Sequence, residues 1–276
     1  MRIFETFRPE EEWLRKYVSY YYLDIADDAD YFNEYICYPH FNNTVSIYKS
    51  HCAEYGMNKT KIRYVQDGKS LQIFTALRES PLKVTQVGPV FKLAIVFEPF
   101  GFNQFVDHDF DVHTLQELQQ DFLDQESILE IFQNTSIQHI TTLLDDRLSQ
   151  KFNTVENGYV RKALELFHEQ DQDWNLDDLA SHKLGISRKQ LTRLFQKYIG
   201  TSPQKYRSIV RFRQLMNHKL REQTGDTYTA LSHQAHYTDQ SHFIKACKQL
   251  TGLTPSQFFK EGKIVGQEDT FWKFTG

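Results

Sequence analysis

Apolar residues recur at helical spacing twice in the C-terminal third of the chain. One stripe occupies positions 191, 194, 195 and 198, and the other occupies 243, 246, 247 and 250. Steps of three, four and seven residues mark one face of an amphipathic helix. The stripes lie 52 residues apart, and the same offset relates Gly200 to Gly252 and Pro203 to Pro255. The constant offset indicates an internal repeat of one structural unit.

Each repeat has the plan of a helix-turn-helix unit. Ser187 and Asp239 precede the two stripes by four residues, where their side-chain oxygens can cap the first free N–H groups. The repeated glycines suit the left-handed turn that ends a helix. Shorter helical runs, at 176–184 and 229–236, lie just ahead of the stripes. A short helix, a turn and a longer helix can place the second helix in the DNA major groove.

Two more helices are predicted in this region. Residues 160–168 form an amphipathic pattern ahead of the first unit, and a long pattern from Pro203 joins the two units. The apolar positions of the joining helix are Tyr206, Ile209, Val210, Leu215, Met216 and Leu220.

The N-terminal half favours a β-rich sandwich or barrel. Strand-like runs occupy 19–25, 44–48, 62–65, 71–77, 82–87 and 91–97, with turn residues between them. Four aromatic residues are candidates for the inward wall, and they either line a site for one small ligand or simply fill a core. They are Tyr48, Tyr64, Phe74 and Phe97.

Helices are expected at both ends of this half. Residues 9–18 begin with proline and acidic residues, which favours a short helix. Apolar stripes through 114–152 predict helices that either pack on the barrel or pair two subunits.

Composition is that of an ordinary soluble protein, with 40% hydrophobic and 25% charged residues. Three cysteines are too few and too scattered for a disulfide framework. The N-terminus has no apolar signal region, and no run of 18 apolar residues occurs. We therefore expect a cytoplasmic protein with no membrane partner.

Charge divides unevenly along the chain. Residues 1–154 carry a net charge of −9, whereas residues 155–276 carry +5. The segment 181–221 contains eleven Lys or Arg residues and no Asp or Glu. A basic run of this length favours a polyanionic partner such as DNA, although a solvated helix face has the same composition.

Candidate catalytic and metal-binding chemistry is sparse. The segment 107–113 holds histidines and carboxylates that can ligate a metal in principle, but a solvated acidic turn is the better interpretation. No Gly-rich phosphate loop, Gly-x-Ser-x-Gly or His-Glu-x-x-His motif occurs. We expect no catalytic residues, no metal and no cofactor, and hence no enzyme.

The C-terminal motifs resemble the AraC/XylS-type DNA-binding domain of bacterial transcription regulators. They are Leu-Asp-Asp-Leu-Ala (176–180), Gly-Ile-Ser-Arg-Lys-Gln-Leu-Thr-Arg-Leu-Phe (185–195), Thr-Asp-Gln-Ser-His-Phe (238–243) and Gly-Leu-Thr-Pro-Ser-Gln-Phe (252–258). The chain departs from that pattern at His236, where glycine is usual, and at Cys247, where phenylalanine is usual. The N-terminal half is similar, more weakly, to cupin-like sensing barrels through residues 87–101.

The resemblance implies an α+β two-domain protein. Residues 1–152 would form a β-rich sensing and dimerisation domain with C-terminal helices, and 153–158 a linker. Residues 159–265 would form an all-α DNA-binding domain with two helix-turn-helix units joined by a long helix, and 266–276 a tail. The implied partners are promoter DNA, a second subunit, RNA polymerase and a small-molecule effector, and the implied role is transcription activation. A repressor, or a small-molecule-binding or enzymatic barrel with a regulatory tail, stays an alternative.

The same resemblance assigns roles to individual side chains. The base-reading positions are Lys189, Thr192 and Arg193 in the first unit, and Gln240, Ser241, His242 and Lys245 in the second. The phosphate-contacting positions are Arg188, Lys197, Lys205, Arg207 and Arg211. Each subunit would then occupy two successive major grooves, about 34 Å apart.

Overall fold

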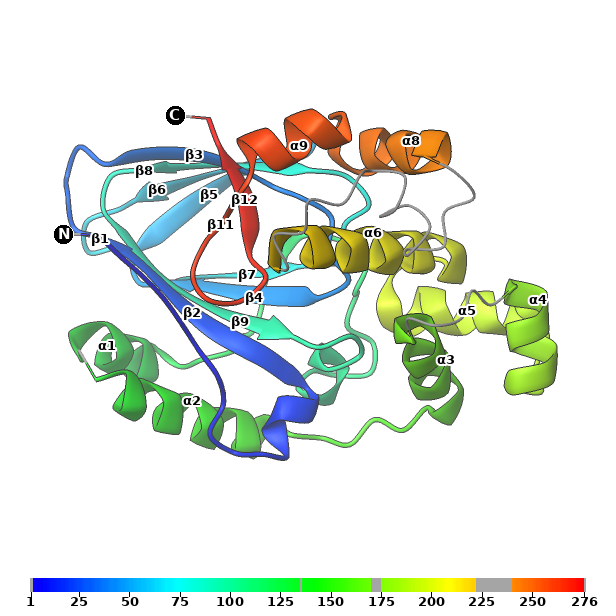
Figure 1. Ribbon diagram of the computed structural model, residues 1–276. Helices are drawn as coiled ribbons and strands as arrows, with labels where there is room; N and C mark the ends of the chain where they lie inside the picture. The colour runs from blue at the N-terminus through cyan, green and yellow to red at the C-terminus, as the bar shows by residue number, and fades with distance from the viewer. Residues whose placement is uncertain (1, 135, 170–174, 222–239, 276) are drawn as a thin grey trace.

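The computed structural model describes residues 2–134, 136–169, 175–221 and 240–275 (Figure 1). A β-rich N-terminal part and a helical C-terminal part follow one another, as the sequence predicts. The predicted helix at 229–236, the cap at Asp239 and the turn at His236 lie outside the described residues.

Two sheets form the N-terminal part. In spatial order, the first consists of β1 (Arg2–Phe7), β2 (Val18–Ala26), β9 (Val90–Phe97), β4 (Asn43–Tyr48), β7 (Leu71–Thr75) and β10 (Gln116–Glu117). The second consists of β11 (Lys263–Ile264), β12 (Phe271–Phe274), β3 (Phe32–Cys37), β8 (Leu82–Val87), β6 (Lys59–Tyr64) and β5 (His51–Gly56). Neighbouring strands are antiparallel except β6 and β8.

Alternation along the strands creates two separate apolar layers. In β9, Ala94 and Val96 face the space between the sheets, whereas Leu93 and Ile95 face the other way. That other face of the first sheet is covered by α1 (Gln125–Gln133) and α2 (Ile137–Lys151). The apolar stripe of α2 is thus used against its own barrel, which decides between the two alternatives that the sequence left open for this segment.

The predicted aromatic wall is correct only in part. Tyr48 lies between the sheets, and Tyr64 is half-buried. Phe74 and Phe97 are fully buried, but they belong to the layer beneath the helices. The prediction was wrong for these two because period-2 alternation does not say which face of a strand meets the second sheet.

One helix prediction near the barrel was wrong, and that for 114–152 was correct only for α1 and α2. Residues 9–18 contain only the 3₁₀ turn η1 (Leu14–Lys16), and β2 begins at Val18. Residues 116 and 117 form β10, which pairs with β7, because Gln72 holds this segment in place by accepting the N–H groups of Phe122 and Leu123. A second 3₁₀ turn, η2 (Phe102–Gln104), follows β9.

The helical part begins with α3 (Gly158–His168), which matches the predicted helix. Then follow α4 (Leu176–Asp178), a π-helical turn η3 (Leu179–Lys183), α5 (Arg188–Ile199), α6 (Pro203–Arg221), α8 (Gln240–Thr251) and α9 (Pro255–Glu261). Here α5 and α8 are the second helices of the two predicted units, and α6 is the predicted joining helix. It packs against α3, α5 and α8.

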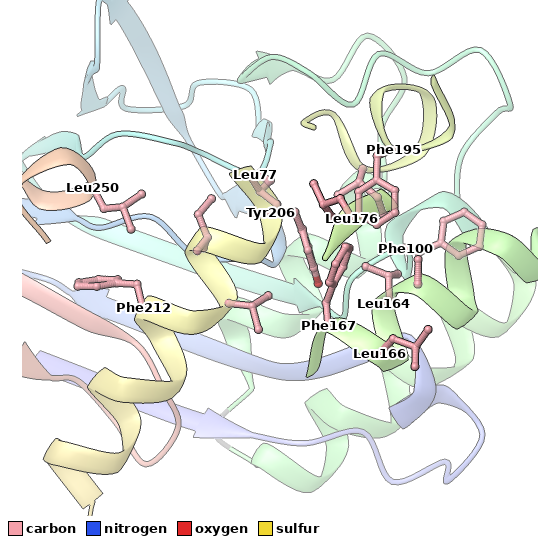
Figure 2. Close-up of a cluster of buried hydrophobic side chains, with 14 of the residues drawn as sticks. Leu77, Phe100, Leu164, Leu166, Phe167, Leu176, Phe195, Tyr206, Phe212 and Leu250 are labelled. Carbon is pink, nitrogen blue, oxygen red and sulfur yellow. The ribbon is translucent and has the colours of Figure 1, made fainter. Parts of the chain in front are cut away.

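One hydrophobic cluster joins the two parts. It combines the buried faces of the helices with Tyr38, Leu77 and Phe100 from the barrel side. Figure 2 shows Leu77 and Phe100 beside the aromatic side chains of α3, α5 and α6. The two parts are therefore packed together and not merely connected by the extended segment after α2.

The last residues of the chain return to the barrel. Strand β12 pairs with β3, and Trp272 stacks on Tyr35 with ring centroids 4.1 Å apart. Its neighbour Phe271 points the other way, into the cluster shared with the helices. The segment that the sequence left as a tail of unknown role thus completes the second sheet.

Substitution of Gly200 tests the packing of the helical part against the barrel. The φ of Gly200 is +81°, and a Cβ there would lie 2.5 Å from the carbonyl oxygen of Val112 on the barrel side. Gly185 has a φ of +66° but nothing within 4 Å of its Cβ position. We expect Gly185→Ala to cost about 1 kcal/mol from backbone conformation alone, and Gly200→Ala to cost more. Urea denaturation of both variants checks this, and equal midpoints would contradict the contact.

Candidate nucleic-acid interface

The first helix-turn-helix unit presents a polar face at the start of α5. Ser187 caps the helix, since its hydroxyl accepts the N–H of Gln190 at 3.1 Å. Arg188, Lys189 and Arg193 are exposed, and Thr192 is half-buried. The opposite face is buried through the residues Leu191, Phe195 and Ile199. Core packing on one side therefore leaves the predicted base-reading positions on the other.

The second unit repeats this arrangement on α8. Its predicted base-reading side chains are all exposed, namely Gln240, Ser241, His242 and Lys245. Phe243 and Cys247 are fully buried beneath them. The thiol of Cys247 lies 3.7 Å from the Thr251 hydroxyl, and burial raises its pKa to about 11. Cys247 is thus a small packing residue in place of the usual aromatic one.

The predicted phosphate contacts fall into different environments. Lys197 is exposed, with its ammonium over the Tyr198 ring. Arg207 and Arg211 are only half-exposed. Lys205 is exposed but lies 2.5 Å from Glu79 of the N-terminal part. The basic run is therefore not one continuous surface.

Arg213 is the clearest exception within that run. Only 2% of its side chain is exposed, because α6 is covered on one side by the helical units and on the other by the barrel and the C-terminal segment. Its guanidinium donates to the backbone carbonyl of Asp269 at 2.6 Å and lies 3.7 Å from the Asp269 carboxylate. A residue that the sequence places only in the basic run is therefore an internal contact.

Asp269 joins three parts of the molecule. Its carboxylate accepts the Tyr20 hydroxyl at 3.1 Å and lies 2.6 Å from Nε2 of His40. Burial alone would raise the pKa of Asp269, but His40 and Arg213 hold it well below its usual range. Burial lowers the pKa of His40, and the Arg213 charge adds to this effect. The cluster therefore keeps Asp269 ionised.

A cavity of about 120 Å³ lies between the two sheets beside this cluster. Its lining includes the cationic side chains Lys92, Arg78 and Arg213, and the tyrosines of β2, β3 and β4 form much of its wall. Lys92 donates to the Tyr22 hydroxyl at 2.7 Å, and burial lowers its pKa. Of the four aromatic wall residues predicted from the sequence, Tyr48 lines this cavity. The sequence analysis missed Lys92, although a charged residue inside an otherwise apolar strand is a usable signal.

The acidic segment 107–113, whose His113 lies 3.2 Å from the carbonyl oxygen of Gly200, forms no comparable buried cluster. Asp107, His108, Asp109, Asp111 and His113 are all exposed, which agrees with a solvated turn. In the part of the chain that the structure describes, no group of three His, Cys, Asp or Glu side chains could hold a metal ion. Nor is any helix in those described ranges long and apolar enough to cross a bilayer.

Comparison with known proteins finds a family match in the helical part. A helix-turn-helix domain family matches residues 180–261. That match covers both α5 and α8, the helices with the exposed polar faces. Residues 180–261 thus match a helix-turn-helix domain, and this is the region whose motifs resemble the AraC type.

Two curated relatives and one solved structure are similar to parts of this chain or to most of its length. An uncharacterized HTH-type transcriptional regulator of Haemophilus influenzae is 25% identical over 155 residues, which are 53% of this chain and 49% of that protein. The HTH-type transcriptional regulator GbdR of Pseudomonas aeruginosa is 31% identical over 93 residues, 34% of this chain and 24% of its own length. The matched regions thus span half or less of these relatives. Wild-type ToxT from Vibrio cholerae aligns with a TM-score of 0.48 and 12% identity over 90% of this chain and 98% of that one.

The ion pair between Lys205 and Glu79 predicts that Glu79 competes with DNA phosphates for the Lys205 ammonium. If Lys205 contacts phosphate, Glu79 opposes that contact, so Glu79→Gln should strengthen DNA binding at about 50 mM salt by up to about fivefold, the range of an exposed ion pair. Glu165→Gln removes a similar exposed pair, with Lys162 at 3.6 Å, and serves as the control. Equal affinities of the two variants, measured by fluorescence anisotropy, would remove Lys205 from the interface.

Proposed function

We propose that this protein is a sequence-specific DNA-binding transcription regulator in which α5 and α8 enter successive major grooves. The observation that carries the proposal is the repeated arrangement of the two helices. Each buries an apolar face and exposes a polar face near its N-terminus, and α6 connects the two units. Helices with this presentation contact base edges from their first turns.

Roles at the interface follow from side-chain chemistry. Arg193 has a guanidinium that can pair with guanine through two hydrogen bonds, and Gln240 can do the same with adenine. Lys189, Thr192, Ser241, His242 and Lys245 complete the proposed base-reading set. Arg188, which now pairs with Asp177 at 2.9 Å, and Lys197 lie where phosphates pass. Lys205, Arg207 and Arg211 extend the phosphate contacts along α6.

The wider role is that of an activator that contacts RNA polymerase and acts as a homodimer. These parts of the proposal rest on the family resemblance. The stripe of α2 is used inside the subunit, so a dimer would need a surface other than that stripe. Each subunit would bind an asymmetric site, and a dimer would bind two of them as direct or inverted repeats.

The cavity between the sheets is the proposed effector site. An engineered cavity of similar size, about 150 Å³, accepts benzene, so about 120 Å³ suits a small molecule. Lys92 is 96% buried, and among the described residues its ammonium hydrogen-bonds only to Tyr22. Lys92 lies directly opposite the buried Asp24 in the β2–β9 pair, and Arg78 and Arg213 also line the cavity. A ligand with a negatively charged group would therefore meet more than one cation there.

Base readout is tested by selection of genomic fragments at about 150 mM salt, where nonspecific binding is weak. Wild type should enrich sites with two motifs one helical turn apart. Arg193→Ala should lose about 1–3 kcal/mol of discrimination at one motif only, whereas Gln196→Ala, an exposed neighbour on α5, should retain both. Lys197→Ala should weaken binding to all sequences equally. A wild type without sequence preference would refute the proposed function.

The effector site is tested by thermal unfolding with small carboxylates such as acetate and benzoate. A bound ligand should raise the melting temperature in proportion to the logarithm of its concentration. Lys92→Met keeps the length of the side chain but removes the charge, so the shift should disappear. A shift that persists in Lys92→Met would place the ligand elsewhere.

A further inference from the structure

The C-terminal segment 263–275 contacts both parts of the molecule. We propose that it is a latch, which holds the AraC-type domain on the barrel in one orientation and must open before both helix-turn-helix units engage DNA. The DNA part of this inference rests on the proposed function.

Neighbouring residues of the latch belong to different cores. Trp272 packs between the two sheets, against Tyr35 and Phe4. Phe271 packs against Tyr38 and Phe258, the latter from α9 of the AraC-type domain. Because successive side chains of a strand point to opposite faces, one short strand reaches into both layers.

Asp269 connects the latch to α6. Its backbone and carboxylate engage Arg213, while His40 and Tyr20 bind the same carboxylate from the barrel. Arg213 is almost fully buried, so removing Asp269 leaves a buried charge without its main partner. Charged partners in a buried contact favour one defined geometry over alternatives, which is the property a latch needs.

The latch is built to open. Strand β12 pairs with β3 through three residues and with β11 through two. Both strands of the segment lie at the edge of the second sheet, so its departure requires no other strand to leave the sheet.

Closure of the latch restrains the DNA-facing charges. With α6 held on the barrel, Lys205 and Thr201 stay on Glu79, at 2.5 and 2.6 Å, and Arg213 stays buried. Opening would release α6 at Arg213 and α9 at Phe258, and the contacts of Lys205 and Thr201 with Glu79 would then be a remaining polar restraint on the N-terminal end of α6. The cavity wall includes Asp269 and Trp272, so a molecule that fills the cavity would act directly on the latch.

Opening is measured by hydrogen exchange at the amide of Thr275, which donates to the carbonyl of Glu34 at 2.8 Å. In Asp269→Asn, which keeps the shape of the side chain, exchange should be about tenfold faster, as expected for loss of a charge-assisted hydrogen bond. Glu268→Gln changes the adjacent residue, whose partner Arg8 lies on the barrel and not on α6. Equal exchange in the two variants would show that Asp269 has no special role.

The effect on DNA is tested with a disulfide across the latch. Ile36 and Lys273 are directly opposite in β3 and β12, and cross-strand Cα distances of about 4.5–5.5 Å suit a disulfide. The oxidised I36C/K273C variant should bind DNA more weakly than wild type, and reduction should restore binding, whereas Asp269→Asn should bind more tightly. Equal DNA affinity in the oxidised and reduced forms would overturn the latch.

Different results would contradict the proposed function and the latch. If no form of the protein binds DNA, the proposed function is wrong, but the exchange rates still report whether Asp269 closes the latch. If wild type binds DNA and the disulfide has no effect, the function stands and the latch does not control it.

Discussion

The wide apolar surface of α6 is the constraint on which the rest of the structure depends. Residues Tyr206, Ile209, Val210, Phe212 and Leu215 are all buried. At about 100° per residue, these positions occupy more than half of the helix circumference. A helix of this kind needs partners on two sides. The helical units supply one, and the barrel with the C-terminal segment supplies the other.

This double packing explains why charged residues occur inside the molecule. Arg213 lies on the covered surface of α6, and its charge requires a partner there. Asp269 supplies that partner from the end of the chain, and His40 and Tyr20 complete the cluster from the barrel. The contact between the helical part and the barrel is thus partly polar, as is common between domains of one chain.

Local sequence patterns correctly predicted the structure where one helix buries one apolar stripe. The spacing at 191, 194, 195 and 198 correctly predicted α5, and Ser187 and Gly200 mark its two ends. The exposure of the proposed base-reading positions then follows, because they are what remains when the buried stripe is removed. The same reasoning failed at Phe74 and Phe97, which are buried as expected but in the wrong layer. A strand of a three-layer arrangement is apolar on both faces, so the sequence does not distinguish them.

The sequence by itself determined the repeated amphipathic helices α5 and α8, the division into a β-rich and a helical part, and the polar faces of these two helices. These features depend on periodicity over a few residues, which the chain carries locally. Only the tertiary structure decided that Arg213 is internal, that Lys205 pairs with Glu79, and that the last strand joins the barrel. Those contacts connect residues 56 to 237 positions apart, such as Asp269 with Arg213 and Trp272 with Tyr35. Their formation depends on which surfaces remain uncovered after the helices and sheets have packed.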